Sequence, residues 1–446
     1  RQGVATLGGG DITVEAKGNI DNLWLSAPTN ARLGGDKDQA ANIENLVVQG
    51  GGDIMERAGG KISKGLFFVG QGQGKVEAGD TLETRVALQD ATVQLSALKN
   101  VTVLDAFNPT ARTQQTANAV AFAIDGVTTG GPASFNSYGD RAVNNGRYDA
   151  SLRVLSRSGD VALSTETNTP NANGEAYPGL LSVRAPQGNI RIDDNAKAKS
   201  LFPNAIGDLD LIAGKDISLA NILVMSDAAV SSIPGITMPT NNTTLSTKLD
   251  NITQQAIGHD PLLLHRDDTK AVRVYAGGDI GDDPESSANL ALHLVLAKPG
   301  VLRAGRDVSN LSVDFQNLTA NDVSQVLAGR DLYYRGNAIE TTNTGAHINI
   351  NGPGRLEVVA GRNIDLDSSN GILSVGNLVN PALSDQGASL TVATGLGAQG
   401  SDARQPDYAA FAANYLTSQK KGDQADKALQ AYFSFLGARA RREIKA

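Results

Sequence analysis

Cysteine is absent from the 446 residues of this chain. Disulfide bonds, thiolate metal sites and cysteine nucleophiles are therefore excluded. Aromatic residues are also scarce, at 4% against 40% hydrophobic residues in total, so a core has to be built mainly from Val, Ile, Leu and Ala. This composition favours many thin apolar layers over one large globular core.

The sequence has no run of about 18 apolar residues, and it therefore predicts no membrane-spanning helix. The formal net charge is −8, which argues against nucleic acid as a partner because that binding depends on clustered Lys and Arg. The chain begins at Arg1 without a signal-peptide pattern, and we interpret this start as a processed or internal boundary of a longer protein.

A short motif, Gly followed by Asp or Asn and an aliphatic residue, recurs along the chain. It occurs as GGDI at 9, KGNI at 17, GGDI at 51, AGDTL at 78, SGDV at 158, QGNI at 187, AGKDI at 213, AGGDI at 276, AGRDV at 304, AGRDL at 328 and AGRNI at 360. Apolar residues alternate with others around it, as Val272, Val274 and Ala276 do before one copy. Period-two patterning on both sides of a Gly–Asx turn predicts a strand, a tight corner and a second strand.

The residue types at this corner suggest why they recur. Gly accepts a positive φ, and Asp or Asn can hydrogen-bond its own backbone in an Asx-turn. The residue between them is expected to face solvent, so that Arg306 and Arg330 form a candidate exposed stripe beside Asp307 and Asp331. The predicted structural corner residues are Gly214, Asp216, Gly277, Asp279, Gly305, Asp307, Gly329, Asp331, Gly361 and Asn363.

From position 276 onward, successive copies of the motif are separated by 28, 24 and 32 residues. Two-residue hairpin turns would give shorter spacings, whereas one solenoid coil with a variable loop takes roughly 20 to 50 residues. We therefore predict an all-β fold, a parallel β-helix (β-solenoid). In such a fold each coil pairs with the coils on either side of it at about 4.8 Å.

The same patterns divide the chain into segments. The prediction is β-helix coils at 1–105, 151–220 and 271–400, a loop-rich insertion at 106–150, an insertion with a candidate short helix at 221–270, and a basic α-helical tail at 401–446.

The tail differs from the rest in charge and in aromatic content. Residues 404–446 contain eight Lys or Arg and four Asp or Glu, which leaves 31 basic and 43 acidic residues for the remainder. A tail of +4 thus adjoins a body of −12, an asymmetry that favours docking of the tail on a neighbouring copy. The candidate subunit or partner contacts are Tyr408, Phe411, Tyr415, Tyr432, Phe433, Arg439, Arg441 and Arg442.

One glycine-rich stretch, VGQGQGK at 69–75, is similar to a phosphate-binding loop. That loop requires Ser or Thr after its Gly-Lys pair, but Val76 follows Lys75 here. We interpret the stretch as a glycine-rich coil corner.

The histidines show no ligand spacing. His259, His265, His293 and His347 include no pair at helical or zinc-finger spacing. Two of them lie in the only local cluster with acid–base character, GHDPLLLHRDD at 258–268. Charged residues prefer the surface, so we interpret this segment as a hydrophilic re-entry into the next coil.

Acidic pairs offer little more. Those at Asp36 and Asp38 and at Asp282 and Asp283 lack EF-hand spacing. Asp365 and Asp367 could lie about 7 Å apart on one strand, a separation that suits glycoside hydrolysis. No Arg or His accompanies them to indicate a cleft. We therefore predict a protein without enzymatic activity, with no catalytic residues, no cofactor and no metal site.

The recurrent AGxDI corners between alternating strands resemble the filamentous haemagglutinin family, large exoproteins of Gram-negative bacteria exported by two-partner secretion. The stretch from about 265 to 400, above all GPGRLEVVAGRNIDL followed by GNLVNPAL, is similar to the uncharacterised C-terminal module of these proteins. The resemblance implies a right-handed β-helix, an extracellular or cell-surface location, and an outer-membrane transporter as the partner during export.

Three functions remain open from the sequence. The first is a non-enzymatic surface protein for adhesion, biofilm matrix or filament assembly by subunit stacking, whose partners are copies of itself, a host or bacterial surface receptor, or a glycan. The second is a carbohydrate-binding or carbohydrate-cleaving β-helix. The third is a delivery shaft for a toxin outside this chain.

Overall fold

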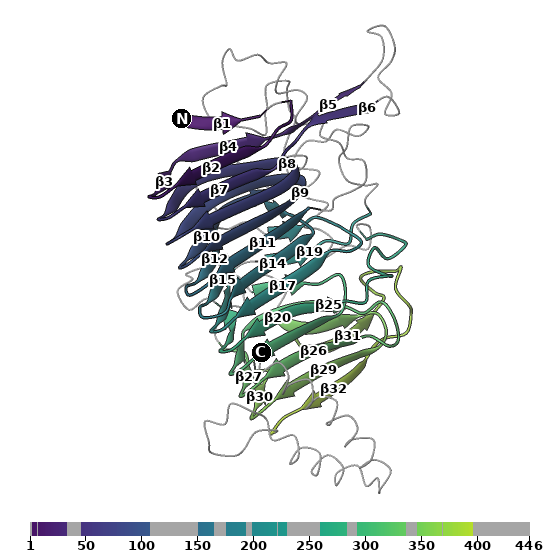
Figure 1. The fold of residues 1–446 in the computed structure, drawn as a ribbon. Helices are drawn as coiled ribbons and strands as arrows, with labels where there is room; N and C mark the ends of the chain where they lie inside the picture. The colour runs from purple at the N-terminus through teal and green to yellow at the C-terminus, as the bar shows by residue number, and fades with distance from the viewer. Residues whose placement is uncertain are drawn as a thin grey trace, which may run out of the picture.

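The predicted parallel β-helix is confirmed by a computed structural model, in which successive coils stack along one long axis (Figure 1). No helix occurs within the described ranges. The structure describes residues 2–6, 8–33, 46–107, 150–164, 175–192, 199–220, 222–229, 259–282, 292–335, 346–367 and 369–395.

Each coil contributes strands to three faces, and the first face contains the strands that lead into the Gly–Asx corner. These are β2 (Ile12–Ala16), β7 (Ile54–Ala58), the later parts of β8 (Ile62–Ala78) and β9 (Leu82–Ala97), β11 (Ser151–Ser156), β14 (Leu180–Ala185), β17 (Asp208–Ala213), β20 (Val272–Ala276), β23 (Gly300–Ala304), β26 (Val323–Ala328), β29 (Arg355–Ala360) and β32 (Ser389–Ala393). Neighbouring strands of this face pair in parallel.

The second face consists of the strands that follow the corner. They are β3 (Ile20–Asp21), the first parts of β8, β9 and β10 (Val101–Phe107), β12 (Val161–Leu163), β15 (Ile190–Ile192), β18 (Ile217–Leu219), β21 (Ile280–Asp282), β24 (Val308–Ser309), β27 (Leu332–Tyr333) and β30 (Ile364–Asp365). Their pairing is also parallel.

The third face closes the coil. It contains β1 (Gln2–Ala5), β4 (Leu23–Ala27), the middle of β8 and β9 and the end of β10, and then a separate seven-stranded parallel sheet. That sheet is formed by β13 (Glu175–Tyr177), β16 (Lys199–Leu201), β19 (Ile222–Met225), β22 (Leu292–Val295), β25 (Leu311–Gln316), β28 (His347–Asn351) and β31 (Gly371–Gly376). An antiparallel hairpin, β5 (Thr29–Leu33) and β6 (Leu46–Gly50), leaves the stack between β4 and β7.

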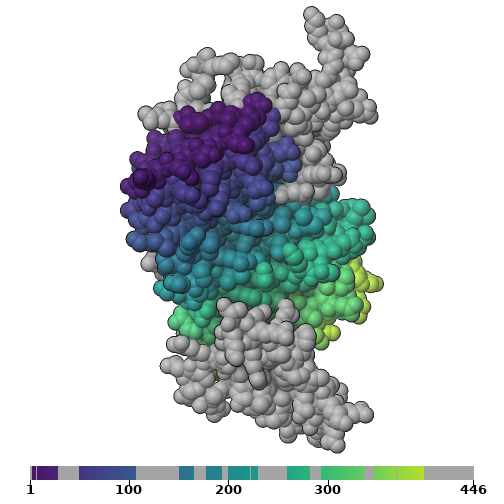
Figure 2. All heavy atoms as spheres, viewed as in Figure 1, coloured from purple at the N-terminus to yellow at the C-terminus, as the bar shows by residue number. Residues whose placement is uncertain are grey.

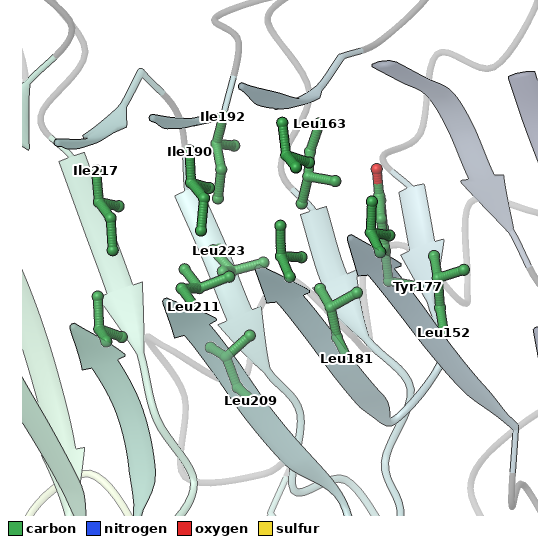
Figure 3. Close-up of a cluster of buried hydrophobic side chains, with 14 of the residues drawn as sticks. Leu152, Leu163, Tyr177, Leu181, Ile190, Ile192, Leu209, Leu211, Ile217 and Leu223 are labelled. Atoms are coloured by element: carbon green, nitrogen blue, oxygen red, sulfur yellow. The ribbon is translucent and has the colours of Figure 1, made fainter. Parts of the chain in front are cut away.

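The interior consists of aliphatic columns that repeat from coil to coil. Leu152, Leu181 and Leu209 occupy equivalent positions in consecutive strands of the first face and are buried. Ile190 and Ile217 form part of the corresponding column on the second face, and the two columns point toward each other in Figure 3. Full burial of one such side chain contributes roughly 1.5–3 kcal/mol, so the stacked columns are the main source of stability.

The recurring motif marks two different corners. Most copies lie between the first and second faces, where an Ala such as Ala304 ends the first strand and an aliphatic residue such as Val308 begins the second. The two GGDI copies instead precede the first face, because Ile12 and Ile54 begin β2 and β7. Two coils turn the main corner without the motif, at 58–62 (AGGKI) and 97–101 (ALKNV).

The last described coil leaves part of its apolar column exposed. Leu390 and Val392 on β32 continue the columns of Leu356 and Val358 on β29, yet they are 42% and 50% exposed. The surface view shows the coils as consecutive bands from one end of the stack to the other (Figure 2). The columns are therefore open to solvent at this end of the described stack.

Candidate functional site

The predicted corner residues form two columns along one edge of the solenoid. The carboxylate of each Asp accepts a hydrogen bond from the backbone N–H of the equivalent residue in the next coil. Asp216 Oδ1 accepts from Asp279 N at 2.7 Å, Asp279 Oδ1 from Asp307 N at 2.8 Å, Asp307 Oδ1 from Asp331 N at 3.0 Å, and Asp331 Oδ1 from Asn363 N at 3.1 Å. The expected Asx-turn within each corner is therefore wrong, since the side chain joins two coils.

The corner glycines are required for a different reason from the one the sequence suggested. Their φ angles are not positive, in contrast to those of glycines elsewhere in the chain. A Cβ on Gly277 would lie 2.2 Å from Gly214 O, and one on Gly305 would lie 2.2 Å from Gly277 O. Gly329 and Gly361 repeat this approach at 2.1 Å. At these four positions glycine is needed because the backbone of the preceding coil lies too close for a side chain.

The arginines of the corner are not a free solvent-facing stripe. Arg306 Nη2 donates to Asp279 Oδ2 at 2.7 Å and to Asp216 Oδ1 at 2.8 Å, so it spans the two preceding coils. Arg330 donates through Nε to Asp307 at 3.0 Å, and its pKa is raised by that hydrogen bond. These side chains are 43% and 28% exposed. They therefore act as clamps along the Asp column, which corrects the expectation from sequence.

A broad groove of about 650 Å³, lined by both apolar and charged side chains, runs across β9, β11, β14, β17 and β20. Arg273 binds Asp210 through Nε at 2.7 Å, and Arg184 lies 3.5 Å from the same carboxylate. Arg153 and Arg157 also line the groove and have no ion pair within the described part of the chain. The lining carries more basic than acidic side chains, which favours an anionic ligand.

Two of the four histidines are brought together on the third face. His293 of β22 and His347 of β28 flank Asp314 of β25, and the ring centroids of the two histidines lie 5.2 Å apart. Asp314 Oδ2 is hydrogen-bonded to His293 Nε2 and lies 3.1 Å from His347 Nε2. Burial alone would raise the pKa of Asp314, but its hydrogen bonds with both histidines hold that pKa well below its usual range. Sequence spacing gave no signal for this cluster, which has the donor set of a metal site.

His265 is buried and the side chain of His259 is 7% exposed, so the expectation of a hydrophilic surface segment at 258–268 is wrong for these two histidines. His259 Nδ1 lies 2.8 Å from Asp227 Oδ1. His265 is 1% exposed, and burial, with a contribution from Lys298, lowers its pKa to about 4. Lys298 is itself fully buried and donates to Asp268 at 2.6 Å. The buried ammonium of Lys298 is therefore paired with a carboxylate of this segment.

The remaining sequence candidates offer no further site in the described ranges. VGQGQGK, interpreted from sequence as a glycine-rich coil corner, lies within β8 where that strand passes from the third face to the first, and Gly72 there has a φ of +127°. Asp365 and Asp367 are both exposed and hydrogen-bond to each other through Asp367 N at 3.2 Å. Asp36, Asp38 and Asp283 lie outside the described residues.

The predicted helical tail and its contacts also fall outside the described part of the chain. This applies to 401–446, to most of the insertions at 106–150 and 221–270, and to the candidate contacts Tyr408, Phe411, Tyr415, Tyr432, Phe433, Arg439, Arg441 and Arg442. No helix within the described ranges is long and apolar enough to cross a membrane. Comparisons with family models, curated proteins and solved structures give no match to the chain.

Proposed function

We propose that this chain is a non-enzymatic structural shaft of a secreted or surface-bound bacterial protein, which serves adhesion, biofilm matrix or filament assembly through stacking of subunits. The observation that carries the proposal is the continuous register from coil to coil. The Asp column, the arginine clamps and the aliphatic columns all join one coil to the next. Such interactions favour a rigid rod, which suits reach and stacking.

Stacking of subunits follows from the geometry of a parallel coil. The two ends of such a stack present complementary strand edges, and an end-to-end contact of this kind does not close on itself. Leu390 and Val392 present half-exposed apolar side chains at one end. At the other end, Ile12 and Val14 of β2 occupy the equivalent columns. A second copy that adds its β2 end to β32 would continue both columns.

Sedimentation velocity over a concentration series tests the stacking. We expect larger species for the unmodified chain at high concentration and their loss in the double variant Leu390→Lys/Val392→Lys. Leu98→Lys is the matched control because Leu98 is 48% exposed on a corner in the middle of the stack. The same monomer peak for all three proteins at every concentration would reject stacking.

The proposed location, outside the cell or on the surface of a Gram-negative bacterium, rests on the resemblance of the AGxDI runs to exported exoproteins. Export would use an outer-membrane transporter as partner. The absence of cysteine is compatible with passage in an unfolded state. Protease accessibility of the protein on intact source cells tests this location, and full protection until lysis would contradict it.

The groove across the first face favours a second function, the binding of an anionic polysaccharide. Arg153 and Arg157 supply positive charge without a carboxylate partner among the described residues. We expect heparin, used as a probe, to bind more tightly than uncharged dextran and to lose affinity in Arg153→Ser/Arg157→Ser. Lys61→Ser, on an exposed corner, is the control. Equal binding of both polysaccharides, or an unchanged double variant, would remove this function.

A further inference from the structure

The register of the third face brings three potential metal ligands from three consecutive coils to one point. His293 of β22 lies opposite Ser312 of β25, and Asp314 follows Ser312 by two positions on the same strand. Because side chains alternate with period two, Ser312 and Asp314 point to the same side of the sheet. His347 of β28 occupies the next coil, beside Asn349, which lies opposite Asp314.

The distances suit one small ion after minor side-chain adjustment. The ligand atoms of His293, Asp314 and His347 all lie within 4.8 Å of one another. Both imidazoles present Nε2 to the same carboxylate oxygen, Asp314 Oδ2. A zinc ion takes nitrogen ligands at about 2.0–2.1 Å and carboxylate oxygen at about 2.0–2.2 Å. An ion placed between the three atoms needs only a small outward movement of Asp314 from the two rings.

A fourth side chain orients the carboxylate. Asn349 Nδ2 donates to Asp314 Oδ1 at 2.9 Å, which leaves Oδ2 directed at the imidazoles. Hydrogen bonds of this kind to a ligand carboxylate are typical of metal sites and strengthen binding. Asn349 Oδ1 is buried and has no hydrogen-bond partner in the described part of the chain.

The cluster is accessible but partly protected. The side chains of His293 and Asp314 are each 19% exposed and that of His347 is 11% exposed. Water can therefore reach the three ligands and occupy further coordination positions, as it does in zinc sites with three protein ligands.

We propose that His293, Asp314 and His347 bind a divalent first-row transition-metal ion such as Zn²⁺, and that this ion links three consecutive coils of the solenoid. Two imidazoles and one carboxylate select such ions over Ca²⁺ and Mg²⁺, which prefer oxygen ligands alone. In the absence of metal, the hydrogen bonds between Asp314 and the two histidines hold the cluster together. The ion would take the place of the proton in the hydrogen bond between Asp314 and an imidazole, because nitrogen and carboxylate ligands bind a metal in their deprotonated form.

Isothermal titration of the full chain with ZnCl₂ at pH 7.5 tests the site. We expect one ion per chain, at least tenfold weaker binding in His347→Ala and Asp314→Ala, and no heat with CaCl₂ at the same concentrations. Asp365→Ala, which removes an exposed carboxylate from the second face, should bind as the unmodified chain does.

Thermal unfolding distinguishes this site from weak surface binding. Zinc should raise the midpoint of the unmodified chain and of Asp365→Ala and leave that of His347→Ala unchanged, because an ion that binds the folded chain at this site stabilises it and an ion that is bound only weakly does not. Asp314→Asn, which keeps the shape of the side chain, covers the case in which Asp314→Ala fails to fold. Zinc binding of equal strength in the unmodified chain, His347→Ala and Asp314→Asn would overturn the proposal, and so would the absence of binding to the unmodified chain.

Discussion

Glu56 is the residue whose replacement should change stability in the most informative way. It lies on β7 in a column of the first face that Val14 and Val76 occupy in the neighbouring coils. Its side chain is 2% exposed, and its Oε1 has no hydrogen-bond partner in the described residues. Burial raises the pKa of Glu56 to about 7 from its usual 4.5.

The sign and size of the effect follow from these two pKa values. Below pH 4.5 the carboxyl of Glu56 is protonated in both the folded and the unfolded chain, so it carries no charge penalty. As pH rises from 4.5 to about 7, the unfolded chain releases the proton while the folded chain retains it, and folding becomes less favourable. At about 1.4 kcal/mol per pKa unit, the full loss above pH 7 is about 3 kcal/mol.

Glu56→Gln removes the titration and keeps the shape, and Glu56→Val restores the residue type of the neighbouring coils. As pH rises from 4.5 to 8, the unfolding free energy of both variants should increase by about 3 kcal/mol relative to that of the unmodified chain. Urea denaturation followed by the fluorescence of Trp24 measures this, because that single tryptophan lies on β4 beside β8 in the same group of coils.

Glu15→Gln serves as the control, since Glu15 is 59% exposed on the adjacent strand β2. Its unfolding free energy should follow that of the unmodified chain at every pH. A difference between Glu56→Gln and the unmodified chain that stays constant from pH 4.5 to pH 8 would refute the reasoning, because it would mean that Glu56 does not titrate inside the column.

Three further predictions concern the corner and the re-entry segment. Gly329→Ala should destabilise the fold by about 1–3 kcal/mol because its Cβ meets Gly305 O at 2.1 Å, whereas Gly18→Ala, which has open space around it, should cost far less in the same urea titration. Asp307→Ala should lower the free energy of unfolding by about 1–3 kcal/mol, because Asp331 N loses its acceptor and Arg330 loses its partner. Asp307→Asn should recover part of this loss in thermal unfolding, since Asn is the natural residue at 363, and an equal loss in both variants would contradict the Asp column. The unmodified chain should lose about 3 kcal/mol of unfolding free energy as pH falls from 6.5 to 4, because the unfolded chain gains a proton on His265 that the folded chain accepts only near pH 4. His265→Gln should not show this loss, and parallel acid-unfolding curves for the two proteins would count against it.

The fold could be predicted from sequence because its corner is a local signal. A Gly–Asx turn between alternating strands needs only a few adjacent residues, and it recurs in most coils. Two corners lack the full motif and were not predicted. One has Lys61 where the others have Asp or Asn, and the other has Leu98 where the others have Gly. The exact hydrogen bonds could not be predicted, because a side chain that binds within its own turn and one that binds the next coil leave the same sequence pattern.

The histidine cluster could not be predicted because its members belong to different coils. Asp314 follows His293 by 21 positions and precedes His347 by 33, so no fixed spacing connects the three residues. Only the strand register shows that these residues meet. The burial of His265 was missed for a similar reason, since Lys298 and Asp227, which interact with it electrostatically, lie on other segments of the chain.

Electron microscopy of the purified protein with and without residues 404–446, at several concentrations, shows whether the chain forms a shaft that stacks end to end. We expect narrow rods one solenoid wide that join end to end as concentration rises, and shorter assemblies when the basic tail is removed. Identical single particles in both samples at every concentration would contradict this expectation.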